Sequence, residues 1–319
     1  MSVPRIAVVG VGHMGAFHVE KLAQLEAEGV ARLACICDTD SERAREIAVK
    51  YGVPCLEDVG QVHEFASAAC VAVPTTAHAR VAGQLLEAGL DVLVEKPIAT
   101  TREEARTLIE LAARRKRVLQ VGHIERFSRA FAAIQPVLKN PRFIEAHRIG
   151  PYPGRATDVS VILDVMIHDL DIVASLAGSE VERVEAMGIP VLSKNEDIAN
   201  ARIRLANGCI LNLTASRVSL ESMRKVRIFQ SDGYISIDFG TNIITIVRRE
   251  GQPGAGEAPS IRVEKLEFDP ADALLEQDRA FAASVRDRKA PRVSGEDGYR
   301  ALDLALRIEE SIEPMEGSE

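Results

Sequence analysis

One short stretch near the amino terminus limits the possible folds of this chain more than any other. The apolar run Arg5–Val9 leads directly into Gly10-Val11-Gly12-His13-Met14-Gly15, and a helical pattern follows from Ala16 to Glu28. A G-x-G-x-x-G sequence alone is weak evidence, but here a strand precedes it and a helix follows it, as the motif requires. Its glycines let the backbone approach a pyrophosphate, whose charge the helix N-terminal amides face. We therefore expect a dinucleotide to bind at Gly10, Gly12, His13, Met14 and Gly15.

Strand-like and helix-like segments alternate regularly in the first third of the chain. Short apolar runs, typical of buried parallel strands, occur at residues 31–37, 69–73, 92–94 and 118–121, and helical patterns separate them. This alternation is the signature of a doubly wound sheet. We therefore predict an α/β protein in which residues 1–122 form an N-terminal NAD-binding Rossmann domain with a doubly wound parallel sheet.

Two loops that follow these strands are expected to contact the cofactor. The strand at 31–37 ends in Asp38-Thr39-Asp40, where an acidic side chain can accept hydrogen bonds from an adenosine ribose and repel a 2′-phosphate. Asp38 and Thr39 therefore favour NAD over NADP. Alternatively, Asp38 or Asp40 only caps the next helix, for which Ser41 is also a plausible N-cap. The strand at 69–73 leads to a loop that we expect on the nicotinamide side, at Pro74, Thr75 and His78.

The run Val92-Leu93-Val94 is followed without a break by Glu95-Lys96-Pro97. Charged residues at the carboxyl end of a buried parallel strand lie where open α/β sheets bind ligands. Pro97 restricts its own φ and favours extended geometry at Lys96, so the turn is stiff. We expect Glu95 and Lys96 to lie at the cofactor. The alternative is a surface ion pair that closes the strand.

The pattern changes after Gly122. Strand-like runs follow one another at residues 143–148, 184–189, 199–205, 209–217, 225–231, 234–238 and 243–248, and Asn207-Gly208 and Asp232-Gly233 are hairpin signals. Helical patterns occupy residues 128–138, 161–176, 272–286 and 295–312. We predict that residues 123–319 form an α+β domain with a large, mostly antiparallel open sheet. This domain is expected to bind the substrate and to mediate assembly into a homodimer or homotetramer.

A carboxylate and an imidazole are spaced four residues apart in the mostly apolar helical pattern at 161–176. At this spacing Asp164 and His168 point from one helical face. A carboxylate beside an imidazole keeps it basic and oriented, as general base catalysis requires. For an isolated helix the alternative is a core histidine with a structural partner. Asp169 and Asp171 are expected to form a solvated or structural face.

Several arginines of the second half are candidates for binding a substrate pyrophosphate, because planar guanidinium groups match phosphate oxygens. They are Arg126, Arg148 and Arg155, and each could equally be a surface arginine. His123 and Tyr152 are further candidates for substrate contacts, and for His123 a structural role is an equal alternative.

Composition excludes several classes of partner. The net charge of −8 argues against binding to nucleic acid or to an anionic membrane surface, so the expected partner is a small-molecule substrate. No apolar run is long enough to span a bilayer, and no basic-then-apolar leader opens the sequence. The five cysteines form no Cys-x-x-Cys pair, so we expect neither a metal site nor a disulfide framework. These features predict a cytoplasmic protein with reduced thiols.

The three motifs Gly10-x-Gly12-x-x-Gly15, Glu95-Lys96-Pro97 and Asp164-x-x-x-His168, in this order, resemble the Gfo/Idh/MocA family of NAD(P)-dependent oxidoreductases. The resemblance covers essentially the whole chain. It implies that Lys96 and His168 lie at the substrate carbon that faces the nicotinamide, with Asp164 beside them. The implied activity is NAD-dependent oxidation of a secondary hydroxyl group of a sugar.

Within the family, three segments are most similar to dehydrogenases of UDP-sugars. They are Gly122–Phe127, Glu145–Arg148 and Leu163–Asp169. The candidate arginines also favour a nucleotide sugar as substrate. The alternatives are a dehydrogenase of inositol or another free sugar, and a non-catalytic NAD(H)-binding sensor on the same fold. The full set Lys96, Asp164 and His168 favours catalysis, because a sensor needs no base at a hydride-transfer site.

Overall fold

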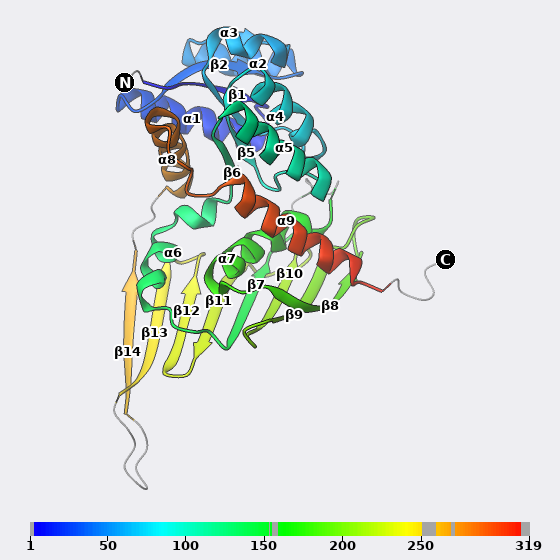
Figure 1. Ribbon diagram of the computed structural model, residues 1–319, viewed down its shortest axis with the longest axis vertical. Coiled ribbons are helices and arrows are strands. Elements are labelled where there is room, and N and C mark those ends of the chain that lie inside the picture. The colour runs from blue at the N-terminus through cyan, green and yellow to red at the C-terminus, as the bar shows by residue number, and fades with distance from the viewer. Residues whose placement is uncertain (1–2, 153, 155–158, 251–259, 269–271, 314–319) are drawn as a thin grey trace. The chain divides into compact units, whose positions relative to one another are not determined.

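The structure is a computed structural model that describes residues 3–152, 154, 159–250, 260–268 and 272–313. The chain forms two compact units (Figure 1). The first comprises Met1–Phe127 and Asp272–Leu302, and the second comprises Ser128–Ala271 and Asp303–Glu319. The predicted boundary assigned all of residues 123–319 to the second domain. It differs from these units for residues 123–127 and for the segment from Asp272 to Leu302, both of which belong to the first unit.

The first unit is built on a six-stranded parallel sheet with the strand order β3-β2-β1-β4-β5-β6. Its strands are β1 (Arg5–Val9), β2 (Arg32–Cys37), β3 (Cys55–Leu56), β4 (Ala68–Val71), β5 (Asp91–Glu95) and β6 (Leu119–Gly122). Val8 on β1 pairs with Ile36 on one side and with Cys70 on the other. The order reverses between β1 and β4, and in such sheets ligands bind outside the carboxyl ends of the strands at this switch point.

Helices connect and cover these strands, as the alternating pattern predicts. They are α1 (His13–Ala27), α2 (Ser41–Tyr51), α3 (Val62–Phe65), α4 (His78–Glu87), α5 (Arg102–Arg115) and α8 (Ala273–Asp287), with the short 3-10 turns η1 (Val59–Gln61), η2 (Thr75–Ala77) and η3 (Ile124–Phe127). Helix α5 begins with a capping box in which Thr101 and Glu104 satisfy each other's backbone amides. Helix α8 lies against α1, and its Phe281 is fully buried in the same core as Leu22 and Ile36.

The second unit contains an eight-stranded sheet with the order β14-β13-β12-β11-β7-β10-β9-β8. Its strands are β7 (Phe143–Ile149), β8 (Val181–Ile189), β9 (Ile198–Leu205), β10 (Ile210–Ser216), β11 (Met223–Gln230), β12 (Gly233–Asp238), β13 (Ile243–Glu250) and β14 (Ser260–Glu267). All neighbours pair antiparallel except β7 and β10, which are parallel. Both predicted hairpins form, β9–β10 at Asn207-Gly208 and β11–β12 at Asp232-Gly233. The predicted fold class is confirmed.

Helices cover one face of this sheet (Figure 1). They are α6 (Arg129–Ile134), which continues into the 3-10 turn η4 (Gln135–Val137), the π-helical turn η5 (Ile162–Met166), α7 (Ile167–Ala177) and α9 (Gly295–Glu310), the last of which contributes residues to both units. Along β7, buried residues such as Ile144 and Ala146 alternate with half-buried ones, as expected for a sheet with one covered face. Two strands, β3 and β14, were not predicted.

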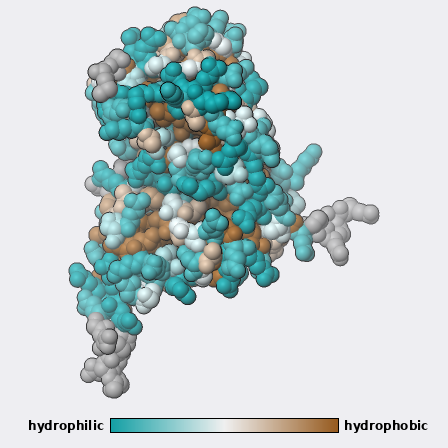
Figure 2. Space-filling model, viewed as in Figure 1, coloured by the Kyte–Doolittle hydropathy of each residue, from teal (hydrophilic) through white to brown (hydrophobic). Residues whose placement is uncertain are grey.

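On the surface shown in Figure 2, hydrophilic side chains predominate in both units, with patches of hydrophobic side chains among them. In the part of the chain that the structure describes, none of the helices is both long enough and apolar enough to cross a membrane.

Candidate functional site

The glycine-rich loop after β1 has the close backbone approaches that its motif predicts. Gly10 has a φ of +84°, and a Cβ placed there would lie 2.7 Å from the carbonyl oxygen of Ala72. A Cβ on Gly15 would lie 1.8 Å from the carbonyl oxygen of Gly10, so α1 can pack here only through a glycine. Gly12, the N-cap of α1, has open space where its Cβ would be and provides no side-chain cap. The loop therefore fits a phosphate group at the start of α1.

Asp38 lies beside this loop at the end of β2. Its Oδ2 accepts a hydrogen bond from Val11 N–H at 2.6 Å, and its Oδ1 accepts one from Asp40 N–H at 2.9 Å. The carboxylate is half-buried, and its hydrogen bond with Val11 places it next to the backbone that would hold the pyrophosphate. This position suits a ribose contact, and exposed Thr39 follows it. Asp40, not Ser41, is the N-cap of α2, and its side chain accepts from Arg43 N–H.

The loop after β4 is joined to the turn after β5 by a buried histidine. One ring nitrogen of His78, Nδ1, lies 2.7 Å from the carbonyl oxygen of Pro97, and Nε2 lies 3.0 Å from that of Val73. Burial lowers the pKa of His78, despite these two carbonyl contacts. This geometry gives His78 a structural role, and its direct contact with the cofactor stays a prediction. Pro74 is exposed and Thr75 half-buried at the same edge of the sheet.

Glu95 and Lys96 are positioned by the buried strand β5. Glu95 is 7 % exposed, Lys96 is half-buried, and the Lys96–Pro97 peptide bond is cis. Because β5 neighbours β4 and runs parallel to it, both residues lie at the carboxyl edge of the sheet, on the same side as the glycine-rich loop. The interpretation of Glu95 as part of a surface ion pair does not fit its burial.

In the second unit, Asp164 and His168 lie on either side of a change in helical type. Asp164 is within the π-helical turn η5, which closes through a bond from Ile167 N–H to the Ile162 carbonyl, and His168 is in the first turn of α7. Both side chains are half-buried. Single π turns inside helices are rare and occur frequently at functional sites. The sequence predicted one regular helix here. The π turn corrects that prediction, and it contains the candidate residue Asp164.

The predicted substrate arginines have different surroundings. The Arg148 guanidinium forms a bidentate, buried pair with Asp169, with Nε–Oδ2 at 3.1 Å and Nη2–Oδ1 at 2.9 Å. Asp169 is therefore not solvated, and this pair anchors α7 to β7. Arg126 is half-buried, with Nη2 3.9 Å from Oδ1 of Asp297. Arg155 lies outside the described residues.

The remaining substrate candidates differ in exposure. His123 is buried, with 1 % of its surface exposed, at the end of β6 in the first unit. Tyr152 is exposed, in the loop that follows β7 in the second unit. Exposure alone assigns neither side chain a role.

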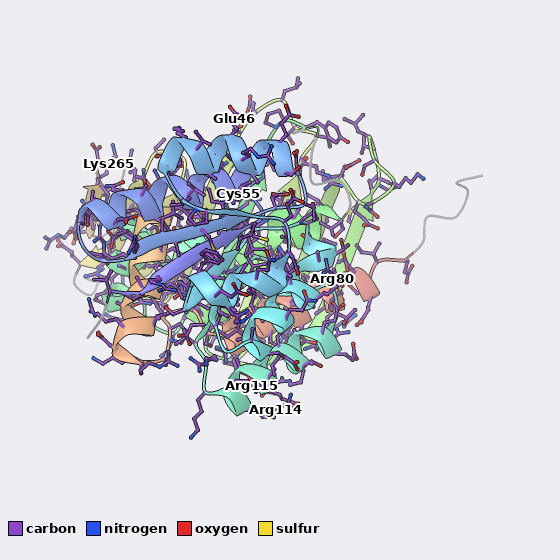
Figure 3. All side chains as sticks on the ribbon, turned by 90° about the horizontal axis from the view of Figure 1, so that it is seen from above. Glu46, Cys55, Arg80, Arg114, Arg115 and Lys265 are labelled. Carbon is purple, nitrogen blue, oxygen red and sulfur yellow. The ribbon has the colours of Figure 1, made fainter. Side chains whose placement is uncertain are left out.

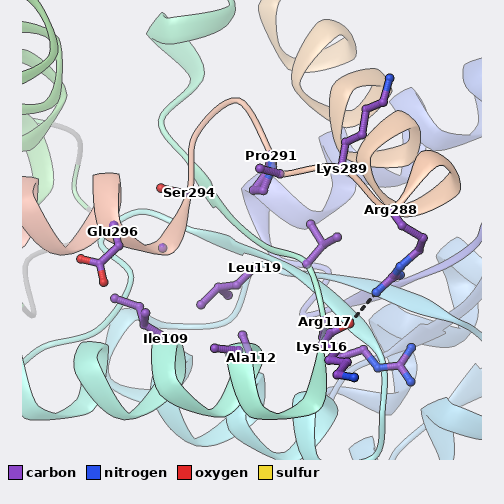
Figure 4. A pocket seen from close by; sticks show the side chains of 14 residues that line it. Ile109, Ala112, Lys116, Arg117, Leu119, Arg288, Lys289, Pro291, Ser294 and Glu296 are labelled. Carbon is purple, nitrogen blue, oxygen red and sulfur yellow. Dashed lines mark hydrogen bonds between the residues drawn. The ribbon is translucent and has the colours of Figure 1, made fainter.

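A cavity of about 450 Å³ in the first unit lies at the opposite edge of the sheet (Figure 4). Lys116, Arg117 and Arg288 line it, and Arg288 donates to the Lys116 carbonyl. Arg114 and Arg115 belong to the last turn of α5, and Figure 3 shows both at that end of the helix. Cations suit a helix C-terminus, because they complement its dipole. Since β6 begins at this cavity, it is not the site formed at the carboxyl ends of the strands.

Three residues that were not among the predicted site residues form a buried cluster with Glu95. They are His18 on α1 and Gln277 and Asp278 on α8. His18 follows Gly15 by three residues and is fully buried on α1. A histidine on the buried face of the first helix was the one available local signal. The helix at α8 was predicted, but no pattern in the sequence linked it to Glu95 or His18.

Comparison with known proteins agrees with this architecture. The model of the GFO/IDH/MocA oxidoreductase family with an NAD-binding Rossmann fold matches residues 4–123, and that of the GFO/IDH/MocA C-terminal domain matches residues 140–236. UDP-N-acetylglucosamine 3-dehydrogenase from Acidithiobacillus ferrooxidans is 36 % identical over 97 % of both chains. A solved structure of that enzyme has a TM-score of 0.90 at 34 % identity and covers 98 % of both chains. Myo-inositol 2-dehydrogenase from Thermotoga maritima is 26 % identical over 97 % of this chain and 96 % of its own. This chain therefore belongs to the Gfo/Idh/MocA family of oxidoreductases and carries its NAD-binding Rossmann domain.

Proposed function

We propose that this protein oxidises the 3-hydroxyl group of UDP-N-acetylglucosamine to the 3-keto sugar nucleotide, with NAD⁺ as the oxidant. The observation that carries the proposal is the 36 % identity, over 97 % of both chains, to a UDP-N-acetylglucosamine 3-dehydrogenase. A 3-keto group is the substrate an aminotransferase needs to make a 3-amino sugar. The proposal therefore assigns the protein to the supply of 3-amino sugar nucleotides for lipid A.

The proposed chemistry assigns one task to each of three residues. His168, oriented by Asp164, takes the proton of the sugar hydroxyl as general base. Lys96 donates a hydrogen bond to the same oxygen and stabilises the negative charge that develops on it. Bound NAD⁺ supplies the acceptor for the hydride that leaves the carbon, so the products are a ketone, NADH and a proton. The π turn at Asp164 and the stiff, buried turn at Lys96 support these assignments.

Cofactor and substrate contacts complete the proposal. The amides at Gly12, His13, Met14 and Gly15 hold the pyrophosphate of NAD, and Asp38 accepts hydrogen bonds from its ribose. Arg126 is the described arginine best suited to the UDP pyrophosphate. Arg148 already pairs with Asp169, so a structural task suits it better. We propose a homodimer or homotetramer as the assembly, which light scattering after gel filtration tests.

A dehydrogenase of inositol is the second candidate, and the 26 % identity to a myo-inositol 2-dehydrogenase favours it. One experiment separates the two. NADH formation is followed at 340 nm with UDP-N-acetylglucosamine, other UDP-sugars, myo-inositol and free sugars, with and without an aminotransferase that removes a 3-keto product. We expect turnover with UDP-N-acetylglucosamine that the aminotransferase increases. Turnover only with a polyol would contradict the nucleotide-sugar assignment, and NADH binding without turnover of any of them would favour a sensor.

A further inference from the structure

A buried chain of polar side chains runs from α8 through α1 to the end of β5. His18 has no exposed surface, and its Nδ1 lies 3.0 Å from both carboxylate oxygens of Asp278, which is also fully buried. Its Nε2 lies 3.2 Å from Oε1 of Glu95, the residue before Lys96. The side-chain amide of Gln277 donates to the same oxygen at 3.4 Å. These side chains thus connect α1, which begins at the glycine-rich loop, and α8 to the end of β5.

The geometry favours a doubly protonated His18. Both ring nitrogens face carboxylate oxygens, and a neutral imidazole would place a lone pair against one of these anions. Burial would lower the pKa of His18, but the charge and hydrogen bonds of Asp278, with Cys70 and Glu95, raise that pKa well above its usual value. Burial raises the pKa of Asp278, which opposes the pairing. Nδ1 lies 3.0 Å from each Asp278 oxygen, an arrangement that suits an imidazolium donating to an ionised carboxylate.

A metal site is the competing interpretation of this cluster. The Nδ1 or Nε2 of His18, the Sγ of Cys70 and a carboxylate oxygen of Asp278 lie within 4.8 Å of one another. A metal needs a lone pair on the imidazole and a thiolate. Both nitrogens of His18 donate to carboxylates instead, and burial raises the pKa of the Cys70 thiol to about 11, so it stays neutral. In the described geometry the cluster is an ion network, because both ring nitrogens of His18 face carboxylate oxygens.

The network fixes both the position and the charge of Glu95. A Cβ added to Gly122 would lie only 2.4 Å from Oε1 of Glu95. The Glu95 carboxylate therefore packs directly against the backbone of β6. Burial would raise the pKa of Glu95, but the hydrogen bond and charge of His18, and then the charge of Lys96, lower it. A buried carboxylate that loses its counter-charge takes up a proton or moves towards water. Since Lys96 is the next residue, either change reaches it directly.

We propose that His18 and Asp278 are positioning residues for the dehydrogenase reaction, because they hold the ionised Glu95 carboxylate that in turn sets the position of Lys96. This inference rests on the proposed function only through Lys96. It assigns to the returning helix α8 a task in catalysis without contact to substrate or cofactor. Other ionisable groups that act on the network are Cys70, His78, Lys96 and Asp272.

The first test is kinetic and uses Asp278→Asn, Glu95→Gln and the double variant. We expect Asp278→Asn to lower kcat by about tenfold to 10²-fold, the cost of a misplaced catalytic group, while KM for the sugar changes little. If Asp278 acts through Glu95, the double variant has the kcat of Glu95→Gln alone. Multiplied losses in the double variant would overturn the proposal.

The matched control is Asp91→Asn. Asp91 is a buried carboxylate on the same strand, 2 % exposed, but at the amino end of β5, where it pairs with Arg288. We expect this variant to lower the melting temperature while its kcat stays that of the wild type. An equal loss of kcat in Asp91→Asn would mean that removing any buried carboxylate of β5 lowers kcat by destabilising the protein. That result would contradict the inference.

The second test needs no turnover. In the wild-type protein with ¹⁵N-labelled histidine, the ring nitrogens of His18 should both show protonated shifts at pH 7.5, with His18→Gln used for assignment. A neutral ring at that pH overturns the proposal. NADH affinity, measured by the fluorescence of NADH itself, should be nearly unchanged in Asp278→Asn. If the wild type turns over no sugar, the proposed function fails, while the His18 spectrum still tests the network.

Discussion

Lys96 and His168 carry the proposed chemistry, and each can be removed without disturbing the glycine-rich loop. Lys96→Met deletes the donor to the developing alkoxide, which we expect to lower kcat by about 10²- to 10³-fold. His168→Ala deletes the general base, at a cost of roughly 10²- to 10⁴-fold. NADH affinity should change little in both, because neither residue belongs to the phosphate-binding loop. Steady-state kinetics and NADH titration check this, and a large loss of NADH affinity in both variants would refute the assigned roles.

Asp38 is expected to set the cofactor preference. Asp38→Ala removes a carboxylate that suits the ribose and also loses the hydrogen bond from Val11 N–H at 2.6 Å. We expect weaker NAD binding, by about tenfold or more for a lost charged hydrogen bond, and a relaxed discrimination against NADP. Asp40→Ala is the control, because Asp40 only caps α2, so it should cost about 1 kcal/mol of stability and leave the preference intact. An unchanged NAD to NADP ratio in Asp38→Ala would exclude the ribose contact.

At the scale of elements, the buried Arg148–Asp169 pair decides how α7 is held on β7. Arg148→Met leaves Asp169 buried without its counter-charge, which costs about 3–5 kcal/mol of unfolding free energy. Denaturant unfolding measures this loss. If Arg148 instead binds the substrate pyrophosphate, KM for a UDP-sugar rises and stability is preserved. Arg126→Met provides the comparison, because Arg126 is the arginine proposed for that pyrophosphate.

A second buried pair holds the connection between β8 and β9. Asp197 accepts hydrogen bonds from the amides of Val191, Leu192 and Ser193, and from Arg217 Nε at 2.8 Å. Burial would raise the pKa of Asp197, but these donors outweigh it and hold the pKa well below the ordinary value of 3.8. Because the folded pKa is the lower one, the stabilisation is complete above pH 3.8 and is lost as the pH falls towards the folded pKa. Unfolding free energy measured from pH 6 to pH 2.5 should therefore fall less steeply in Asp197→Asn.

The sequence predicts an element or site residue well where a short stretch of sequence determines its structure, and poorly where packing against distant residues determines it. Gly10, Gly15 and Asp38 lie within one β–α–β segment, from β1 through α1 to the end of β2, so motif and spacing predicted their positions. Strand β14 escaped prediction because it is an edge strand, exposed on both faces, and its charged residues hide an alternating pattern. The π turn at Asp164 depends on how the helix packs, since both helical types suit the same residues.

At the scale of the whole molecule, the sequence did not predict that the segment from Asp272 to Leu302 belongs to the first unit. Helix α8 was expected, but in the wrong domain, because an amphipathic helix does not reveal which surface it covers. Its Asp278 meets His18 across 260 positions, so no local pattern links them. The candidate site was therefore predictable where one motif builds it. It was not predictable where the far end of the chain supports it.

The return of α8 makes the stability of the cofactor domain depend on residues near the carboxyl terminus. Phe281 is fully buried against α1, so Phe281→Ala should lower the unfolding free energy by about 3–5 kcal/mol. Val49→Ala, at an exposed position on α2, should stay within about 0.5 kcal/mol. NADH at 100 times its Kd should restore about 2.7 kcal/mol to the Phe281→Ala variant, because it binds only the folded domain. Calorimetry with and without NADH checks this. A loss that NADH does not offset would mean that Phe281 supports a part of the chain other than the NAD-binding unit.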